Sequence, residues 1–302
     1  MLSGLVQVRP PSDITAVVNV GDDTVLHGLH ISPDLDTITY TLAGLDNRET
    51  GWGVTGETWT VMGELEQLGG ESWFRLGDRD LATHLFRTER LSRGEPLSTV
   101  TAALAARRGL AVRLLPVSDD PVRTRLTLAE ASELGPPGTE VSFQDYFVRL
   151  RHGVAVRAVS FEGAEQAAPG PGVLEALSAA EGIVVCPSNP IVSIGPLLAV
   201  PGLRSALEAR RDDIVAVSPI VAGAALKGPA DRLMAELGAA PTVVGVAELY
   251  APWVGTLVID EADRDLAAAV EAVGLRCVVG PTVMSSPARA AAAATLVLDA
   301  LN

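Results

Sequence analysis

Short apolar runs rich in β-branched residues recur along the chain, and each is closed by small or polar residues, Pro or Gly. Runs of this length and composition are typical of strands buried on both faces of a parallel sheet. The pattern predicts strands over Ile14–Val20, Ala111–Leu115, Ile183–Val185, Ile214–Val217, Thr242–Val246, Gly255–Ile259 and Leu275–Val279.

Segments with a helix-like pattern separate the later strands, so the second half of the chain alternates strand and helix. This order predicts an α/β fold, a Rossmann-like three-layer sandwich with a mostly parallel sheet covered on both faces. We interpret residues 1–302 as a single domain. The expected helices lie over Leu203–Arg211, Pro229–Leu237, Ala262–Val273 and Pro287–Leu301.

Two parts of the chain depart from this regular order. Residues 117–175 are irregular, with a polar turn at 118–121 and a stretch rich in Pro, Gly and Ala at 164–171, and we interpret them as an inserted cap. At the front, Met1–Leu5 resembles the end of a helix, whereas such domains usually open with a strand and a Gly-rich loop that receives phosphates. Either the chain begins differently, or its first strand, its loop and most of a helix are missing.

The charge of the chain narrows the range of partners. The formal net charge is −14, which excludes an extended nucleic-acid groove because phosphate neutralisation needs clustered Arg and Lys. A bound anion then needs local help from backbone NH groups, individual Arg side chains or a metal held by carboxylates. Cys186 and Cys277 stand alone in apolar runs, so we expect free thiols in a cytoplasmic protein without a membrane segment.

The densest candidate chemistry follows the first predicted strand. It consists of Asn19–Asp23 and, shortly after, Asp34 and Asp36 in the segment Ile31–Thr37. Ligands of open parallel sheets bind beyond the carboxyl ends of the strands, where two carboxylates could hold Mg²⁺ if their segment is extended. The alternative is a helix start with Ser32 as its cap, and both interpretations stay open.

Three further segments are candidates for anion binding. The first, Arg75–His84, mixes Arg and Asp: Arg75 or Arg79 could grip an anion, and Asp78 or Asp80 could cap a helix. The others are loops after predicted strands, one with Ser188, Asn189 and Ser193 and one with Gly223. Each also has a purely structural interpretation as a salt-bridged or rigid turn. No Walker A, GxSxG or HExxH pattern is present.

Taken together, these blocks resemble the 2-phospho-L-lactate transferases and their actinobacterial phosphoenolpyruvate-using relatives, which make the deazaflavin coenzyme F(420). The resemblance covers most of the chain, and its specificity comes from six blocks that follow one another in the family's order. The blocks are NVGDD (19–23), ISPDLDT (31–37), RLGDRDLATH (75–84), LPVSDDPVRT (115–124), PSNPIVSIGP (187–196) and VSPIVAGAALKGPA (217–230).

The resemblance implies transfer of a phosphoenolpyruvyl or 2-phospho-L-lactyl group from a guanosine diphosphate-linked donor to 7,8-didemethyl-8-hydroxy-5-deazariboflavin, with release of GMP. It implies Mg²⁺ near Asp34 and Asp36, deazaflavin contacts at Asp36 and Arg75, and a homodimer. Asp34 or Asp36 is also our candidate for accepting the hydroxyl proton. The Arg-rich composition with a single lysine, Lys227, resembles actinobacterial members and favours the enolpyruvyl donor.

Two alternatives accompany this prediction. Family members ordinarily begin with the strand and Gly-rich loop, so a truncated chain would bind GDP weakly and turn over little. A nucleotide-sugar-binding regulatory protein of related fold, without enzymatic activity, shares an NVGDD-like strand end. Such a protein should lack the ISPDLDT and GDRDLATH blocks that this chain contains.

Overall fold

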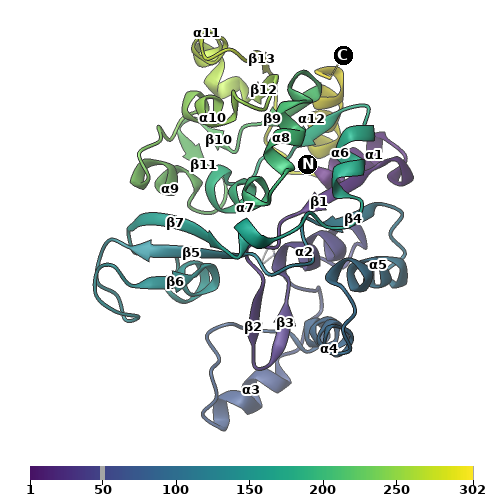
Figure 1. Ribbon diagram of the computed structural model, residues 1–302, viewed down its shortest axis with the longest axis vertical. Coiled ribbons are helices and arrows are strands. Elements are labelled where there is room, and N and C mark those ends of the chain that lie inside the picture. Colours follow the sequence, from purple (N-terminus) through teal and green to yellow (C-terminus); the bar gives the residue numbers. More distant parts are fainter. Residues whose placement is uncertain (48–51, 302) are drawn as a thin grey trace.

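The computed structural model describes residues 1–47 and 52–301 and confirms the α/β prediction. Its larger parallel sheet forms the upper half of the molecule in Figure 1. The strand order is β13–β12–β9–β8, and adjacent strands run parallel in register. The strands are β8 (Ile183–Val185), β9 (Ile214–Val217), β12 (Thr256–Ile259) and β13 (Arg276–Val279).

Strand β9 shows why these short runs are apolar throughout. All four of its residues are buried. Val215 and Val217 pack with Val297 of helix α12 (Pro287–Asp299), while Ile214 and Ala216 belong to the main core on the opposite face. That core also includes residues of α8 (Leu203–Glu208) and α10 (Val243–Tyr250). A strand with helices on both faces cannot alternate apolar and polar residues, and the three-layer arrangement follows.

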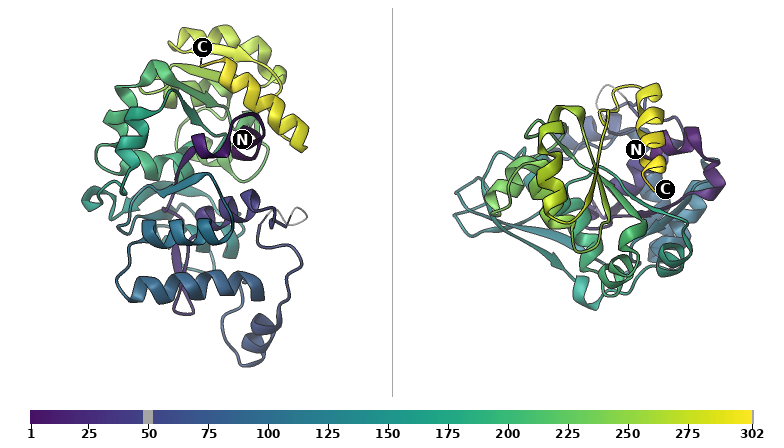
Figure 2. Two further views of the ribbon diagram at one scale, coloured as in Figure 1. Left: turned by 90° about the vertical axis from the view of Figure 1, so that its right-hand side faces the viewer. Right: turned by 90° about the horizontal axis from the view of Figure 1, so that it is seen from above.

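A second parallel pair lies nearer the centre of the molecule. Strand β1 (Thr15–Val18) pairs with β4 (Arg113–Pro116), and helix α5 (Leu97–Arg107) packs on β4. The predicted parallel strands therefore fall into two sheets within the described residues. Helix α1 (Leu2–Val8) packs against α12, so the two ends of the chain lie on the same side, as Figure 2 shows.

The range 117–175 contains an antiparallel sheet with the order β6–β5–β7, which projects from the side of the molecule (Figure 1). Its strands are β5 (Arg123–Leu128), β6 (Glu140–Ser142) and β7 (Val156–Glu162). The range thus has a sheet of its own, although its separation as a cap stays a prediction. A hairpin of β2 (Thr24–Leu26) and β3 (Leu29–Ile31) descends from the end of β1.

One predicted strand is wrong. Residues Val243–Tyr250 form helix α10, where we expected a strand over Thr242–Val246. The Thr242 side chain accepts a hydrogen bond from Gly245 N and caps this helix, and Val243, Val246, Ala247 and Tyr250 are buried along it. A short run that is apolar on all sides fits a buried helix as well as a buried strand, so its periodicity does not separate the two.

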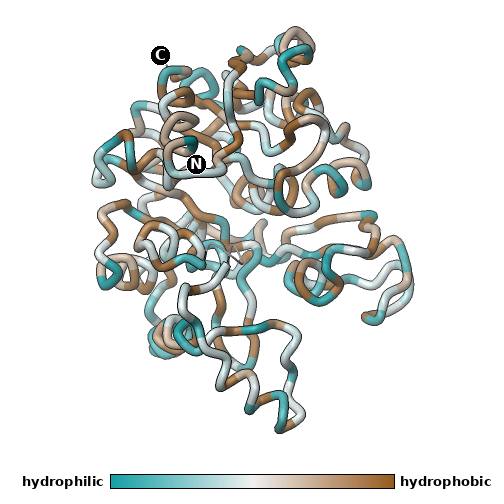
Figure 3. Tube along the Cα trace, turned by 180° about the vertical axis from the view of Figure 1, so that it is seen from behind, coloured by the Kyte–Doolittle hydropathy of each residue, from teal (hydrophilic) through white to brown (hydrophobic). Residues whose placement is uncertain are grey.

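The four expected helices are confirmed with small shifts of their ends, and Ala262–Val273 is divided between a 3₁₀ segment and α11. The helices whose bounds have not yet been given are α2 (Pro33–Leu42), α3 (Thr60–Gln67), α4 (Asp78–Ser92), α6 (Val173–Ala179), α7 (Gly195–Ala199), α9 (Ala230–Glu236) and α11 (Ala267–Ala272). Hydrophilic stretches gather at the outer turns (Figure 3). Among the described residues, no helix combines the length and the apolar character needed to cross a membrane.

The close approach of α1 to α12 yields the first prediction. A Cβ added at Gly4 would lie 2.1 Å from the carbonyl oxygen of Ala290, which is backbone and cannot swing away. We expect Gly4→Ala to lower the free energy of unfolding by about 1–3 kcal/mol through overpacking. The matched control is Gly63→Ala in α3, where nothing lies within 4 Å of the added Cβ. There the removal of glycine should stabilise by roughly 0.5–1 kcal/mol. Urea unfolding measures both, and equal effects would contradict the prediction.

Candidate active site

Three of the sequence blocks meet at Gly21, just beyond the carboxyl end of β1. A Cβ added to Gly21 would lie 2.7 Å from Thr124 Oγ1 and 2.8 Å from Pro196, so only glycine fits without movement. Its carbonyl accepts a hydrogen bond from Thr124 N at 2.7 Å. The turn after β1 is therefore packed between the start of β5 and the segment that follows β8.

Three aspartates lie around this turn, of which Asp22 is buried and Asp23 and Asp34 are half-buried. Asn19 Nδ2 donates to Asp34 Oδ2 at 2.9 Å, and Ser32 Oγ donates to Asp23 Oδ2 at 2.8 Å. The Oδ1 atoms of Asp22 and Asp23 are buried and accept no hydrogen bond from the described part of the protein. Buried carboxylate oxygens without a donor are rare in stable proteins, and such oxygens are able to bind a cation, a water molecule or a ligand donor.

Burial raises the pKa of all three carboxyls. The pKa of Asp22 is well above its usual range because of burial and then because Asp34 and Asp23 lie close by. Burial also raises the pKa of Asp34. It raises the pKa of Asp23 to about 7, against the opposing effects of Ser32 and Arg123. Carboxylates that lie close together away from water repel one another, and this favours their protonation or the binding of a cation.

Asp34 and Asp36 lie in the first turn of α2, which begins at Pro33 after Ser32. The helix-start interpretation is therefore correct, although Ser32 donates to Asp23 and does not cap the helix with its side chain. Residues two apart on a helix do not face each other. Asp34 turns to Asn19, and Asp36 turns to Arg87 of α4.

Asp36 belongs to a second buried group, which continues along one face of α4. Arg87 Nη2 forms an ion pair with Asp36 Oδ1, and Arg87 is 1% exposed. His84 lies between two carboxylates, 3.7 Å from Asp36 Oδ2 and 3.3 Å from Asp80 Oδ2. Tyr40 donates to Asp80 Oδ1 at 2.6 Å. Burial alone raises the pKa of Asp80, but His84, Tyr40 and Arg87 outweigh it and the net shift is downward.

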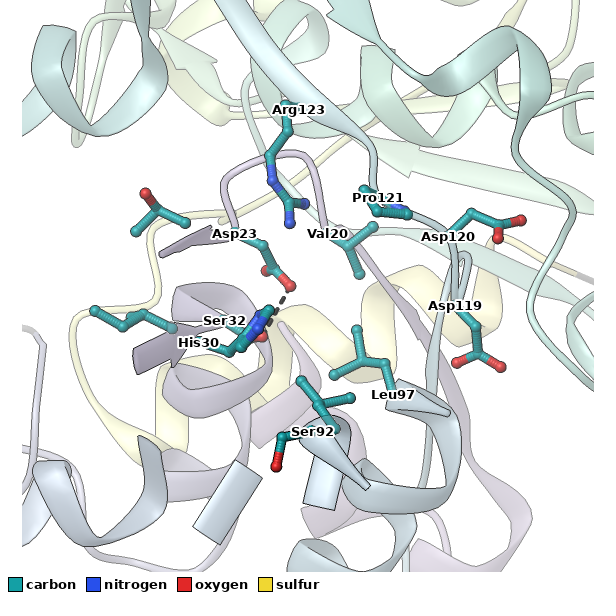
Figure 4. A pocket seen from close by; sticks show the side chains of 13 residues that line it. Val20, Asp23, His30, Ser32, Ser92, Leu97, Asp119, Asp120, Pro121 and Arg123 are labelled. Atoms are coloured by element: carbon teal, nitrogen blue, oxygen red, sulfur yellow. Dashed lines mark hydrogen bonds between the residues drawn. The ribbon is translucent and has the colours of Figure 1, made fainter. Parts of the chain in front are cut away.

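A cavity of about 210 Å³ opens beside Asp23. In Figure 4, Asp23 and Ser32 meet across their hydrogen bond on one wall, and the Arg123 side chain points toward Asp23 from above. Val20 and Leu97 give it apolar walls, and Asp119 adds a further carboxylate. Typical ligand pockets measure roughly 300–1,000 Å³, so this cavity fits one portion of a larger substrate.

The residues of the Arg/Asp segment form caps and an aromatic contact. Asp78 accepts hydrogen bonds from Thr60 N at 3.0 Å and Val61 N at 3.1 Å, so it caps α3. In return Glu57 accepts from Arg79 N at 2.8 Å and caps α4. The Arg79 guanidinium donates to Thr55 O, and the Arg75 guanidinium lies 4.9 Å from the centre of the Trp59 ring.

The loop after β8 keeps one donor free. Asn189 Oδ1 accepts from Ile191 N and Val192 N and so fixes the turn, whereas Asn189 Nδ2 is buried without a hydrogen-bond partner in the described protein. Ser188 and Ser193 are half-buried in the same segment. Gly223 sits elsewhere, at an exposed turn between β10 (Ile220–Val221) and β11 (Ala224–Ala225), where its φ of +76° favours glycine.

The described residues include no group of three or more His, Cys, Asp or Glu side chains arranged to hold a metal. Asp22, which is buried, and Asp34, which is half-buried, nevertheless supply two neighbouring carboxylates, one with an unpartnered oxygen. Oxygen ligands of this kind suit Mg²⁺, which keeps several waters and takes further ligands from substrate phosphates. Asp36 fits less well because a guanidinium already pairs with it.

Residues 1–276 match the family model described as 2-phospho-L-lactate transferase CofD. The chain belongs to the CofD family. It is 47% identical over 302 residues to a phosphoenolpyruvate transferase of Streptomyces griseus, covering 99% of this chain and 93% of that protein. A phosphoenolpyruvate transferase of Mycolicibacterium smegmatis is 41% identical over 293 residues and is covered to 88%. The resemblance seen in the sequence blocks is confirmed, and the chain is a transferase of this type.

A solved structure shares the fold of this CofD member. A protein of the UPF0052 family from Bacillus halodurans superposes with a TM-score of 0.59 at 17% identity, over 98% of this chain and 94% of that one. At this identity the likeness concerns the fold alone. It supports the α/β architecture over the whole described chain.

Sequence reasoning left out Arg87, and it included Asp22 and Asp23 in the densest candidate segment without choosing them as site residues. The two aspartates stand in the NVGDD block, but the choice of Asp34 and Asp36 rested on their i, i+2 spacing. Arg87 could have been found from helical spacing, since Asp80, His84 and Arg87 at i, i+4 and i+7 share one face of a helix. Charged residues at apolar-face positions indicate a buried polar network.

The buried pair yields a second prediction. Arg87→Met leaves the buried Asp36 without its guanidinium partner, and we expect the free energy of unfolding to fall by about 3–5 kcal/mol. The control Arg93→Met removes the exposed pair with Glu89 and should cost no more than about 1 kcal/mol. Adding Asp36→Asn to Arg87→Met should recover part of the loss. Denaturant unfolding measures all four proteins, and similar losses for Arg87→Met and Arg93→Met would refute the assignment.

The raised pKa of Asp23 gives a third prediction, which concerns the pH dependence of stability. The folded protein holds this proton up to about pH 7, while an unfolded chain releases it near pH 4. The folded state therefore binds more protons between these values, and its stability falls as the pH rises through them. We expect a loss of up to about 4 kcal/mol between pH 4 and 8 in EDTA. The free energy of unfolding of the Asp23→Asn variant should depend less on pH. A dependence parallel to that of the wild type would contradict the prediction.

Proposed function

We propose that this transferase moves a phosphoenolpyruvyl group, or a 2-phospho-L-lactyl group, from a guanosine diphosphate-linked donor to the ribityl hydroxyl of the deazariboflavin precursor of coenzyme F(420). The acceptor oxygen forms a bond to phosphorus, the bond from that phosphorus to the leaving GMP breaks, and the hydroxyl proton is released. The names of the relatives favour the enolpyruvyl group. Mg²⁺ dependence and a homodimeric assembly are part of the same proposal.

The observation that carries the proposal is the pattern of unpartnered buried atoms at one sheet edge. Asp22 and Asp23 offer oxygens without a donor, and Asn189 offers an amide without an acceptor. The two segments touch, since the turn at Gly21 packs against Pro196. A magnesium-bound diphosphate presents a cation and anionic oxygens side by side, and so it complements both kinds of atom.

Asp22 and Asp34 are the residues that would hold the cation. When bound, it neutralises charge that develops on the phosphoryl oxygens during transfer. The chain's own part is positioning. Asn19 holds Asp34 through Nδ2 and holds the turn through Gly21 N at 2.8 Å. Ser188, Asn189 and Ser193 are proposed to receive the donor phosphates with their amide, hydroxyl and backbone NH groups.

The cavity beside Asp23 is proposed to receive the acceptor. Its apolar walls suit part of a ring or ribityl chain, and its polar wall, which includes Asp23 and Ser32, suits a hydroxyl group. Asp34 and Asp36 remain the candidates for taking the hydroxyl proton. Arg75, Asp78, Arg79 and Gly223 remain proposed substrate contacts, although the first three already have protein partners.

The experiment is a mass-spectrometric transfer assay with deazariboflavin, each guanylyl-linked donor and Mg²⁺. We expect a mass gain on the acceptor together with GMP, and a loss of at least about 100-fold in kcat/KM for Asp34→Asn. The control Asp212→Asn changes a carboxylate whose side chain is 93% exposed and should be silent. Full turnover by Asp34→Asn at saturating Mg²⁺ would remove Asp34 from the site. No transfer by the wild type with either donor would overturn the proposed reaction.

A further inference from the structure

A buried amide from the antiparallel sheet region reaches the acidic turn. Gln144 Nε2 donates to the carbonyl oxygen of Asp22 at 2.9 Å, across 122 residues of sequence. Gln144 is 5% exposed. The reaction proposed above assigns no role to this contact, although it joins the segment after β6 to the residue expected to hold the cation.

The backbone around Gln144 is unusual and firmly held. Ser142 Oγ donates to Asp145 Oδ2 at 2.7 Å, and a π-helical turn then covers Asp145–Arg149. Arg151 and His152 follow with φ of 51° and 43°, in the left-handed region. This conformation is unfavourable for residues other than glycine, and strained segments persist where the surrounding structure enforces them. Here Arg232 Nη1 donates to His152 O at 2.7 Å.

The turn after β1 is thus fixed at three successive places. Asn19 Oδ1 accepts from Gly21 N, Thr124 N donates to Gly21 O, and Gln144 donates to Asp22 O. The last of these bonds acts on the peptide of Asp22 itself. The side chain of Asp22 lies close to Asp34 and Asp23, and these carboxylates repel one another whenever they are ionised. A fixed carbonyl opposes movement under that repulsion.

We infer that Gln144 is a positioning residue, which holds Asp22 by its carbonyl so that its carboxylate shares a divalent cation with Asp34. The inference rests on the proposed function of that site. An amide is required because the carbonyl needs a donor. A carboxylate at position 144 would remove the donor and add a fourth negative charge. The antiparallel sheet region thereby controls metal affinity without touching the metal.

The test compares Gln144→Met with the control Gln166→Met, whose side chain is exposed in the same region of the chain. Calorimetry with Mg²⁺ and Mn²⁺, and the Mg²⁺ dependence of transfer, are measured beside thermal unfolding. For Gln144→Met we expect a metal Kd raised about tenfold and kcat at saturating metal within about threefold of wild type. Gln144→Glu should lose more affinity, and Gln166→Met should equal the wild type.

If the wild type binds the metal and Gln144→Met binds it with the same Kd, this inference is overturned while the proposed function stands. The same holds if Gln144→Met has a lower melting temperature but an unchanged metal Kd. If the wild type binds no metal, the proposed function fails and this inference fails with it. Should Gln144→Met not fold, Gln144→Asn gives the same test. It keeps the amide but shortens its reach by one methylene, and it should also weaken metal binding.

Discussion

The confinement of negative charge beyond the end of β1 is the constraint on which the rest of this structure depends. Asp22 is buried and Asp23 and Asp34 are half-buried beside it, and the loss of water around each carboxyl opposes its ionisation. A folded protein tolerates such an arrangement when neighbouring groups orient the carboxylates and a cation or proton offsets their charge. The Asn19 and Ser32 bonds and the packing of Gly21 against Thr124 and Pro196 provide that orientation.

Helix α4 connects this charge to the rest of the lower half of the molecule. Arg87 pairs with Asp36 and donates to His30 O at 3.2 Å, and Thr88 Oγ1 accepts from His30 N at 2.8 Å. Both backbone polar groups of His30 in strand β3 are thereby satisfied by one helix. The positive charge of Arg87 also lowers the pKa of Asp23, against the larger effect of burial. Structural support and charge balance come from the same side chain.

The sequence was sufficient for the fold class, the family and the general place of the site, because apolar runs report burial and the blocks follow strand ends. The sequence was not sufficient to predict which carboxylates lie close together in the folded protein. Asp34 and Asp36 are two residues apart in sequence, but a helix turns them to different partners. Asp22 and Gln144 are 122 residues apart and in contact. Helix α10 was missed because its first turn is apolar on all sides, where the pattern of apolar residues carries no period.

The exchanged caps of α3 and α4 couple the folding of two helices. Asp78, the first residue of α4, satisfies backbone NH groups at the start of α3, while Glu57, just before α3, satisfies those at the start of α4. Neither helix start can fray without uncovering donors in the other. The two therefore open to solvent as one cooperative unit, and their first-turn amides share a single protection against hydrogen exchange.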